Sequence, residues 1–310
     1  MDLILAGAGL LLLVFAGDVL VRGAVALALK LGISALVVSL TVVAFGTSAP
    51  ELLIAIEAAL ADADGIAFGN VVGSNIANVL LVIGLPALIA TIRTKECHIG
   101  RNYALMIGAS VLFIALCFLG PLTYWHGVLM LVVLCLILFD AYRKARLSGE
   151  GDSIDELDDA DPDMPVWKIA LFLVLGLIGL PLGANLLIDG ARGVAVAFGV
   201  SDAVIGLTLV AIGTSLPELA TTVMATIRGK ADVVLGNVVG SNLFNLLAIM
   251  GVASFFGPLD VPLEFLTFDL WVMLAASLIL IPFVLHWTNV TRLWGIGFVA
   301  LYAGYVWLLV

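Results

Sequence analysis

Two short stretches of this 310-residue chain each place a glutamate beside small polar residues within apolar sequence. The first reads Gly-Thr-Ser-Ala-Pro-Glu over residues 46–51, and the second reads Gly-Thr-Ser-Leu-Pro-Glu over 213–218. Each is followed by Gly-Asn-Val-Val-Gly-Ser-Asn, at 69–75 and at 236–242. A carboxylate at membrane depth costs several kcal/mol, so it marks a functional site by default. Two glutamates at equivalent repeat positions predict one shared cation site at the repeat interface.

The first motif predicts a helix that breaks and restarts at once. Pro50 and Pro217 cannot donate a backbone hydrogen bond, and proline is tolerated in a first helical turn but not in a helix interior. The preceding Thr or Ser can cap the new helix. Such a break is allowed at membrane depth only where protein or water surrounds it. We expect it to free hard oxygen ligands for Na⁺ or Ca²⁺, namely the carbonyls of Ala44, Thr47, Ala211 and Thr214.

The second motif predicts a helix with one polar stripe. Side chains four residues apart line up on a helix, and this spacing joins Asn70, Ser74 and Asn78, then again Asn237, Ser241 and Asn245. The small residues beside the stripe would let another helix approach closely, as small-xxx-small patterns do. These are Gly69, Gly73, Gly236 and Gly240.

Both motifs belong to an internal repeat in a membrane protein. Residues 32–84 and 199–251 are identical at 24 of 53 positions without a gap. The chain is 63% hydrophobic and 12% charged, with a mean hydropathy of +1.23, which excludes a water-soluble fold. A membrane span takes about 20 apolar residues. Interruptions by charge and Gly/Pro predict ten spans, at 3–29, 35–60, 66–90, 103–119, 122–140, 166–190, 202–227, 233–256, 266–285 and 293–309.

Loop charges predict the orientation of these spans. Alternate loops are rich in Lys and Arg and should face the cytoplasm, whereas the intervening loops carry Asp62, Asp64, Asp260 and Glu264. Both termini would then be external. Each half holds an odd number of spans, so the halves would be inverted. We expect a first five-helix repeat over 1–140, an acidic cytoplasmic linker over 141–165 and a second five-helix repeat over 166–310.

The two motif pairs resemble the repeats of the cation/calcium exchanger superfamily, and most closely the prokaryotic sodium/calcium exchangers. The resemblance covers nearly the whole chain. It implies an all-α polytopic protein of the plasma membrane of a prokaryote, with discontinuous helices at the ion site. It also implies antiport of Ca²⁺ against Na⁺, usually three Na⁺ per Ca²⁺, through a site open to one side at a time.

The resemblance implies a ligand for most of the polar residues of the motifs. Glu51 and Glu218 would bind Ca²⁺ together with the carbonyls of Thr47 and Thr214. One Na⁺ position would use Ala44, Thr47, Ser48, Glu51 and Ser74. Its mirror image would use Ala211, Thr214, Ser215, Glu218 and Ser241. Asn78 and Asn245 would complete the centre.

Asn245 departs from the usual sodium/calcium exchanger pattern, which has Asp at this position. Proton/calcium members of the superfamily have two Glu and two Asn, as this chain does. Two glutamates already neutralise one Ca²⁺, and an Asn resembles a protonated Asp in shape. The Gly-Thr-Ser-x-Pro-Glu sequence still favours Na⁺ as the coupling ion. Proton/calcium antiport stays open as the alternative.

Other functional classes fit the sequence less well. A channel would favour weak sites along a pore, whereas the motifs predict one compact site. No nucleophile or phosphate-binding loop indicates an enzyme, so we expect no catalytic activity, no cofactor and no nucleic-acid partner. The other charges within spans include Asp18 and Arg22, for which we favour an ion pair or an interfacial role over a role as cation ligands.

Overall fold

The computed structural model describes residues 2–148, 164–197 and 213–309, apart from some side chains beside the gaps, and these ranges are helical without any β-strand. The acidic part of the predicted linker, 149–163, lies outside them. The longer helices of the first half are α1 (Asp2–Leu31), α4 (Ala49–Leu60), α5 (Asp64–Leu80), α7 (Gly100–Phe118) and α8 (Tyr124–Ser148). Those of the second half are α9 (Val166–Ala197), α12 (Leu216–Ile227), α13 (Ala231–Leu243), α15 (Leu270–Ile279) and α17 (Arg292–Leu309).

Short helical segments connect or extend these helices. In chain order they are α2 (Ala35–Val38), η1 (Ser39–Val43), α3 (Ala44–Thr47), α6 (Gly84–Ile89), η2 (Thr94–Glu96), η5 (Phe244–Ile249), α14 (Met250–Ala253), η6 (Phe265–Asp269) and α16 (Ile281–Val284). Three of them, η1, η5 and η6, are π-helical. Such segments are rare and often occur at functional sites. Of these, η1 directly precedes the predicted ligand Ala44, and η5 contains the predicted ligand Asn245.

Eight helices of the described chain are long and apolar enough to cross a membrane. The bent pair Ala35–Thr47 and Ala49–Leu60 would be a ninth span. These nine match the predicted spans in order and approximate extent. The seventh predicted span, 202–227, is described only from residue 213 onward, where α12 has 12 residues.

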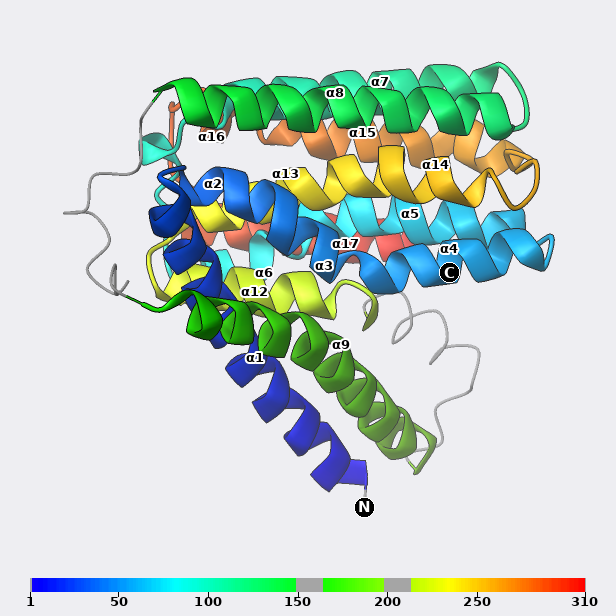
Figure 1. Cartoon of the computed structure of the whole chain (residues 1–310). Helices are drawn as coiled ribbons and strands as arrows, with labels where there is room; N and C mark the ends of the chain where they lie inside the picture. The colour runs from blue at the N-terminus through cyan, green and yellow to red at the C-terminus, as the bar shows by residue number, and fades with distance from the viewer. Residues whose placement is uncertain (1, 149–163, 198–212, 310) are drawn as a thin grey trace.

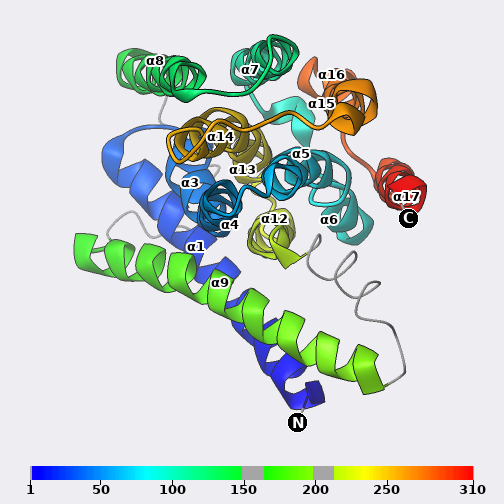
Figure 2. The ribbon, with the colours of Figure 1, turned by 90° about the vertical axis from the view of Figure 1, so that its right-hand side faces the viewer.

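Helices α1 and α9 form a pair that leans away from the rest of the bundle (Figures 1 and 2). They cross tightly at small residues. A Cβ added to Gly183 of α9 would lie 3.0 Å from the backbone nitrogen of Leu13 and 3.1 Å from the carbonyl oxygen of Gly9 on α1. The remaining helices run roughly along one direction, with α5 and α13 in the interior.

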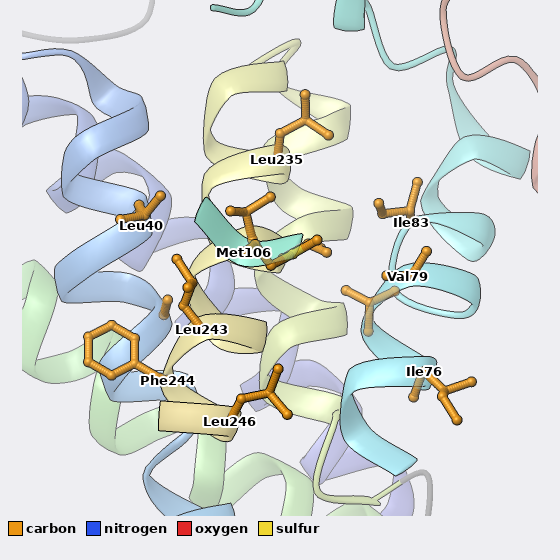
Figure 3. Packing of buried hydrophobic residues seen from close by; sticks show 14 of the residues in the cluster. Leu40, Ile76, Val79, Ile83, Met106, Leu235, Leu243, Phe244 and Leu246 are labelled. Atoms are coloured by element: carbon orange, nitrogen blue, oxygen red, sulfur yellow. The ribbon is translucent and has the colours of Figure 1, made fainter. Parts of the chain in front are cut away.

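The interior is packed by apolar side chains from both halves. Figure 3 shows Leu40 beside Leu243 and Phe244, with Ile76 and Val79 of α5 across from them. The predicted close approach is confirmed at Gly236, where an added Cβ would lie 2.9 Å from the Leu36 carbonyl oxygen. The repeat counterpart of Leu36 is residue 203, which lies outside the described ranges, so the packing of Gly69 and Gly73 stays a prediction.

The loops meet in two groups at opposite ends of the bundle (Figure 1). At one end, Ile92 pairs with Val290, and residues 90–93 line a cavity with residues 226–229. At the other end, Leu122 pairs with Leu259, and the Asp260 backbone nitrogen donates to Asp64 Oδ2 at 2.9 Å. The first group consists of loops predicted to be cytoplasmic, and the second of loops predicted to be external.

Candidate cation site

The helix breaks occur where the motifs place them. Helix α3 ends at Thr47, α4 begins at Ala49, and the two segments are bent by 45°. Pro50 lies in the first turn of α4, as Pro217 does in α12. Ser48 and Ser215 are the N-cap residues, but neither side chain makes a capping hydrogen bond. The predicted capping bond is therefore wrong: Ser48 Oγ donates to Glu218 instead, and Ser215 Oγ has no partner in the described structure.

The carbonyl of Ala44 is not freed by the break. It accepts a hydrogen bond from the Ser48 backbone nitrogen at 3.1 Å and another from Thr47 Oγ1 at 3.3 Å. A carbonyl oxygen has two lone pairs, and both are engaged here. The expectation fails because Ser48 closes one last turn, with φ −84° and ψ 7°, before the chain changes direction. Its repeat counterpart Ala211 lies outside the described residues.

Glu51 and Glu218 are both buried, at 1% and 0% exposure, in the first turns of α4 and α12. The positive end of each helix stabilises a carboxylate at that position. Glu218 Oε1 accepts hydrogen bonds from Ser48 Oγ at 3.1 Å and from Ser241 Oγ at 3.5 Å. The Ser48 bond joins the two repeats. In the described structure the Oε2 atom of each glutamate has no hydrogen-bond partner.

The first asparagine of each stripe holds the backbone of its own glutamate. Asn70 Nδ2 donates to the Glu51 carbonyl at 2.9 Å, and Asn237 Nδ2 donates to the Glu218 carbonyl at 3.3 Å. Thr47 Oγ1 contacts Asn237 Oδ1 at 3.4 Å, which is a second link between the repeats. These asparagines therefore position the glutamates.

Several polar atoms of the motif residues are buried without a hydrogen-bond partner in the described structure. Besides the two glutamate oxygens they include Asn78 Oδ1, both amide atoms of Asn245, and Ser215 Oγ. Buried polar atoms are nearly always hydrogen-bonded, so each exception needs an explanation. Carboxylate, amide and hydroxyl oxygens are hard ligands of the kind that bind Ca²⁺. The arrangement can therefore hold a cation, with two carboxylates to balance a divalent charge.

A family model described as sodium/calcium exchanger protein matches residues 1–142 and 168–310. The chain belongs to the sodium/calcium exchanger family.

Individual relatives agree with this assignment. The chain is 38% identical over 287 residues to the putative antiporter CaxA of Alkalimonas amylolytica, covering 92% of this chain and 90% of that protein. It is 34% identical over 333 residues to the sodium/calcium exchanger MaX1 of Methanosarcina acetivorans, covering 96% and 95%. A structure of the sodium-calcium exchanger NCX_Mj, soaked with zero Na⁺ and Ca²⁺, matches with a TM-score of 0.85 and 32% identity, over 100% and 99% of the two chains.

A cavity of about 360 Å³ reaches the helix breaks of this exchanger-family protein. It is lined by Pro50 of α4, by Asn185 of α9, and by Thr214 and Pro217 at the start of α12. Thr214 is half-buried there, whereas Ser74 and Ser241 are buried on α5 and α13. The cavity lies on the side of the site that α9 covers.

The ion pair predicted between Asp18 and Arg22 is confirmed, with Arg22 Nε 3.0 Å from Asp18 Oδ2. The third member of this cluster could not be predicted from the local sequence. Arg228, at the end of α12, binds Asp18 Oδ1 through Nη2 and through Nε at 2.7 Å. This exchanger-family chain thereby ties α1 to the helix that carries Glu218.

Sequence reasoning also overlooked Asn242. It belongs to the second motif but falls off the predicted stripe, because it is one residue from Ser241. Its side chain is buried and contacts Asn78. Only its place in the repeated Gly-Ser-Asn could have singled it out.

Proposed function

We propose that this protein is a secondary active antiporter that moves Ca²⁺ against Na⁺ by alternating access. One observation carries the proposal. Glu51 and Glu218 follow two equivalent helix breaks, are buried together in the described structure, and each keeps a carboxylate oxygen without a hydrogen-bond donor. Two such carboxylates balance the charge of one Ca²⁺. The family assignment and the names of the exchangers MaX1 and NCX_Mj support Na⁺ as the counter-ion.

We assign Ca²⁺ to the two glutamates and to the carbonyls of Thr47 and Thr214. The Na⁺ positions would add Ser48 and Ser74 on one side, and Ser215 and Ser241 on the other. Ser48 and Ser241 already contact Glu218, so they lie where they could share a cation with it. Ala44 could serve as a Na⁺ ligand only by giving up one of its two hydrogen bonds.

Asn78 and Asn245 are assigned to the centre, each through its amide oxygen. Both oxygens are buried without a partner in the described structure, which supports this role. Ala211 completes the second Na⁺ position by its equivalence to Ala44 in the repeat.

The proposed architecture has ten spans in two inverted repeats, over 1–140 and 166–310, with a cytoplasmic linker over 141–165. The two groups of loops at opposite ends of the bundle support it. The excess of Lys and Arg in one group supports a cytoplasmic position for that group, with both termini outside. The membrane would be the plasma membrane of a prokaryote.

Proton/calcium antiport is the second candidate function. Asn245 favours it, because the site then has two glutamates and two asparagines. The relative CaxA is named only as a putative antiporter, without a coupling ion.

Calcium uptake into proteoliposomes decides between the two functions. Vesicles with an imposed Na⁺, K⁺ or H⁺ gradient are compared at equal external Ca²⁺, with Glu51→Gln protein as the background. We expect uptake only when Na⁺ is loaded inside. Uptake that follows ΔpH in Na⁺-free vesicles, and ignores a Na⁺ gradient, would establish proton coupling instead. Uptake without any counter-gradient would indicate a channel.

A further inference from the structure

The amide of Asn78 is held by an asparagine from the other repeat. Asn78 Nδ2 donates to Asn242 Oδ1 at 3.1 Å, and both side chains are buried. The bond joins α5 to α13. Asn242 Nδ2 in turn donates to the Asn75 carbonyl at 3.5 Å. Both polar ends of Asn242 are thus engaged with protein groups.

This contact fixes which end of the Asn78 amide is available. A primary amide has a donor end and an acceptor end, and only the oxygen can bind a cation. With Nδ2 committed to Asn242, Asn78 Oδ1 is on the opposite side of the amide, where it has no partner in the described structure. A flipped amide would set two acceptor oxygens against each other and present NH₂ in place of the carbonyl.

We propose that Asn242 is a positioning residue for cation binding. It holds the Asn78 amide so that the carbonyl oxygen, and not the NH₂ group, faces a hard cation such as Ca²⁺. The inference rests on the proposed role of Asn78 as a central ligand. Asn242 itself contacts no cation, and it acts through Asn78.

The repeat supplies a matched control. Asn75 is the counterpart of Asn242, 167 positions earlier in the chain, and is equally buried. Its Nδ2 donates to the Val71 carbonyl of its own helix at 2.8 Å. Its Oδ1 has no partner, and neither amide atom of Asn245 has one among the described residues. The second asparagine pair is therefore not formed, and the two repeats differ at this position.

The test compares Asn242→Leu with Asn75→Leu. Both variants replace a buried amide by an apolar side chain of similar size. The KM for Ca²⁺ is measured in proteoliposomes under whichever gradient drives wild-type uptake. We expect Asn242→Leu to raise KM about 10–100-fold, the usual cost of losing a group that orients a metal ligand. Asn75→Leu should leave KM close to the wild-type value. Equal increases in the two variants would overturn the proposal.

Two further variants separate positioning from a general structural role. Asn242→Leu should add nothing to the KM increase of Asn78→Ala, because residues that act through one another are not additive. Asn242→Asp keeps the acceptor oxygen for Asn78 but loses the donor to the Asn75 carbonyl, so its KM should lie closer to the wild-type value than that of Asn242→Leu. An additive double variant, or an Asn242→Asp protein as impaired as Asn242→Leu, would contradict the inference.

Separate controls test whether each variant folds and which ion drives uptake. Size-exclusion profiles and thermal unfolding without Ca²⁺ identify a variant that fails to fold, and Asn242→Ala then replaces Asn242→Leu in the same comparison. Wild-type uptake driven by protons would contradict the proposed function. It would leave the KM comparison intact, because that comparison does not depend on the coupling ion.

Discussion

At the scale of single residues, a hydroxyl group that could cap a helix donates to a glutamate of the candidate cation site instead. Ser48 occupies the N-cap position of α4 but donates to Glu218 of the other repeat. A capping bond commonly stabilises a helix by about 1 kcal/mol, and α4 does without it. Ser48 therefore joins Ser241 in donating to Glu218, whereas Ser215 has no partner in the described structure.

The two glutamates should both be required for Ca²⁺ transport. Replacing Glu51 or Glu218 by Gln halves the negative charge that faces a divalent ion. We expect Ca²⁺ uptake to fall by at least about tenfold, since even the loss of an outer partner costs that much at metal sites. Glu57→Gln, on the exposed face of the same helix α4, is the control and should transport normally. Near wild-type uptake by well-folded Glu51→Gln protein would refute the proposal that Glu51 belongs to the cation site.

Asn245→Asp should make transport more dependent on pH. The Asn245 amide carries no charge at any working pH. A carboxylate at this position, in a site that already has two glutamates, would take up or release a proton as the pH changes. We expect the uptake rate of the variant to vary with pH over a range in which the wild type is flat. The rates are measured from pH 5 to pH 9 at a fixed Na⁺ gradient. Parallel profiles for both proteins would show that position 245 does not contribute its charge to the site.

At the scale of elements, the Asp18–Arg228 pair fastens α1 to the end of α12. The side chains are 20% and 15% exposed, so solvent screens them only in part. The pair is thus a defined tie between the leaning pair of helices α1 and α9 and the helix that bears Glu218. A shift of α1 by one turn, about 5.4 Å, would break it.

A double-mutant cycle with Asp18→Asn and Arg228→Gln should report this tie. We expect a coupling free energy of about 1.5–3 kcal/mol, as for hydrogen bonds to charged groups. The readout is the free energy of unfolding in detergent. The control cycle pairs Asp18→Asn with Arg22→Gln, where the arginine is 47% exposed. That cycle should give about 0.2–1 kcal/mol, and equal coupling in both would argue against a special role for Arg228.

At the scale of the whole molecule, the grouping of the loops predicts a single orientation. Asp62→Cys and Lys95→Cys, each in protein lacking Cys97, Cys117 and Cys135, place a thiol at opposite ends of the bundle. An impermeant thiol reagent applied outside intact cells should label position 62 and leave position 95 unlabelled until the cells are opened. The reverse labelling pattern would show that the protein has the opposite orientation in the membrane.

Transport should also move net charge. Three Na⁺ exchanged for one Ca²⁺ leaves one positive charge uncompensated in each cycle. Calcium uptake into Na⁺-loaded vesicles should therefore speed up when a K⁺ diffusion potential makes the interior positive, and slow down when it makes the interior negative. Rates that ignore the potential would indicate an electroneutral exchange of two Na⁺ per Ca²⁺.

The sequence alone determined the class of this protein and predicted where its cation site lies. The hydropathy of a segment indicates whether it lies in lipid or in water. A proline constrains the backbone conformation within about one helical turn of its position. Both signals are local. Hydropathy could therefore predict the nine spans, and Pro50 and Pro217 could predict the two helix breaks. The repeat then singled out Glu51 and Glu218 as equivalent residues.

Only the tertiary structure decided the contacts between the repeats. Ser48 with Glu218, Asn78 with Asn242 and Asp18 with Arg228 are 164 to 210 residues apart in the chain. No spacing rule relates residues so distant, because their contact depends on how whole helices pack. The repeat also suggested equal halves, whereas the buried hydrogen bonds differ between them. One packed arrangement of the helices can engage Nδ2 of Asn78 and leave Asn245 without a partner in the described structure, although the two motifs are alike.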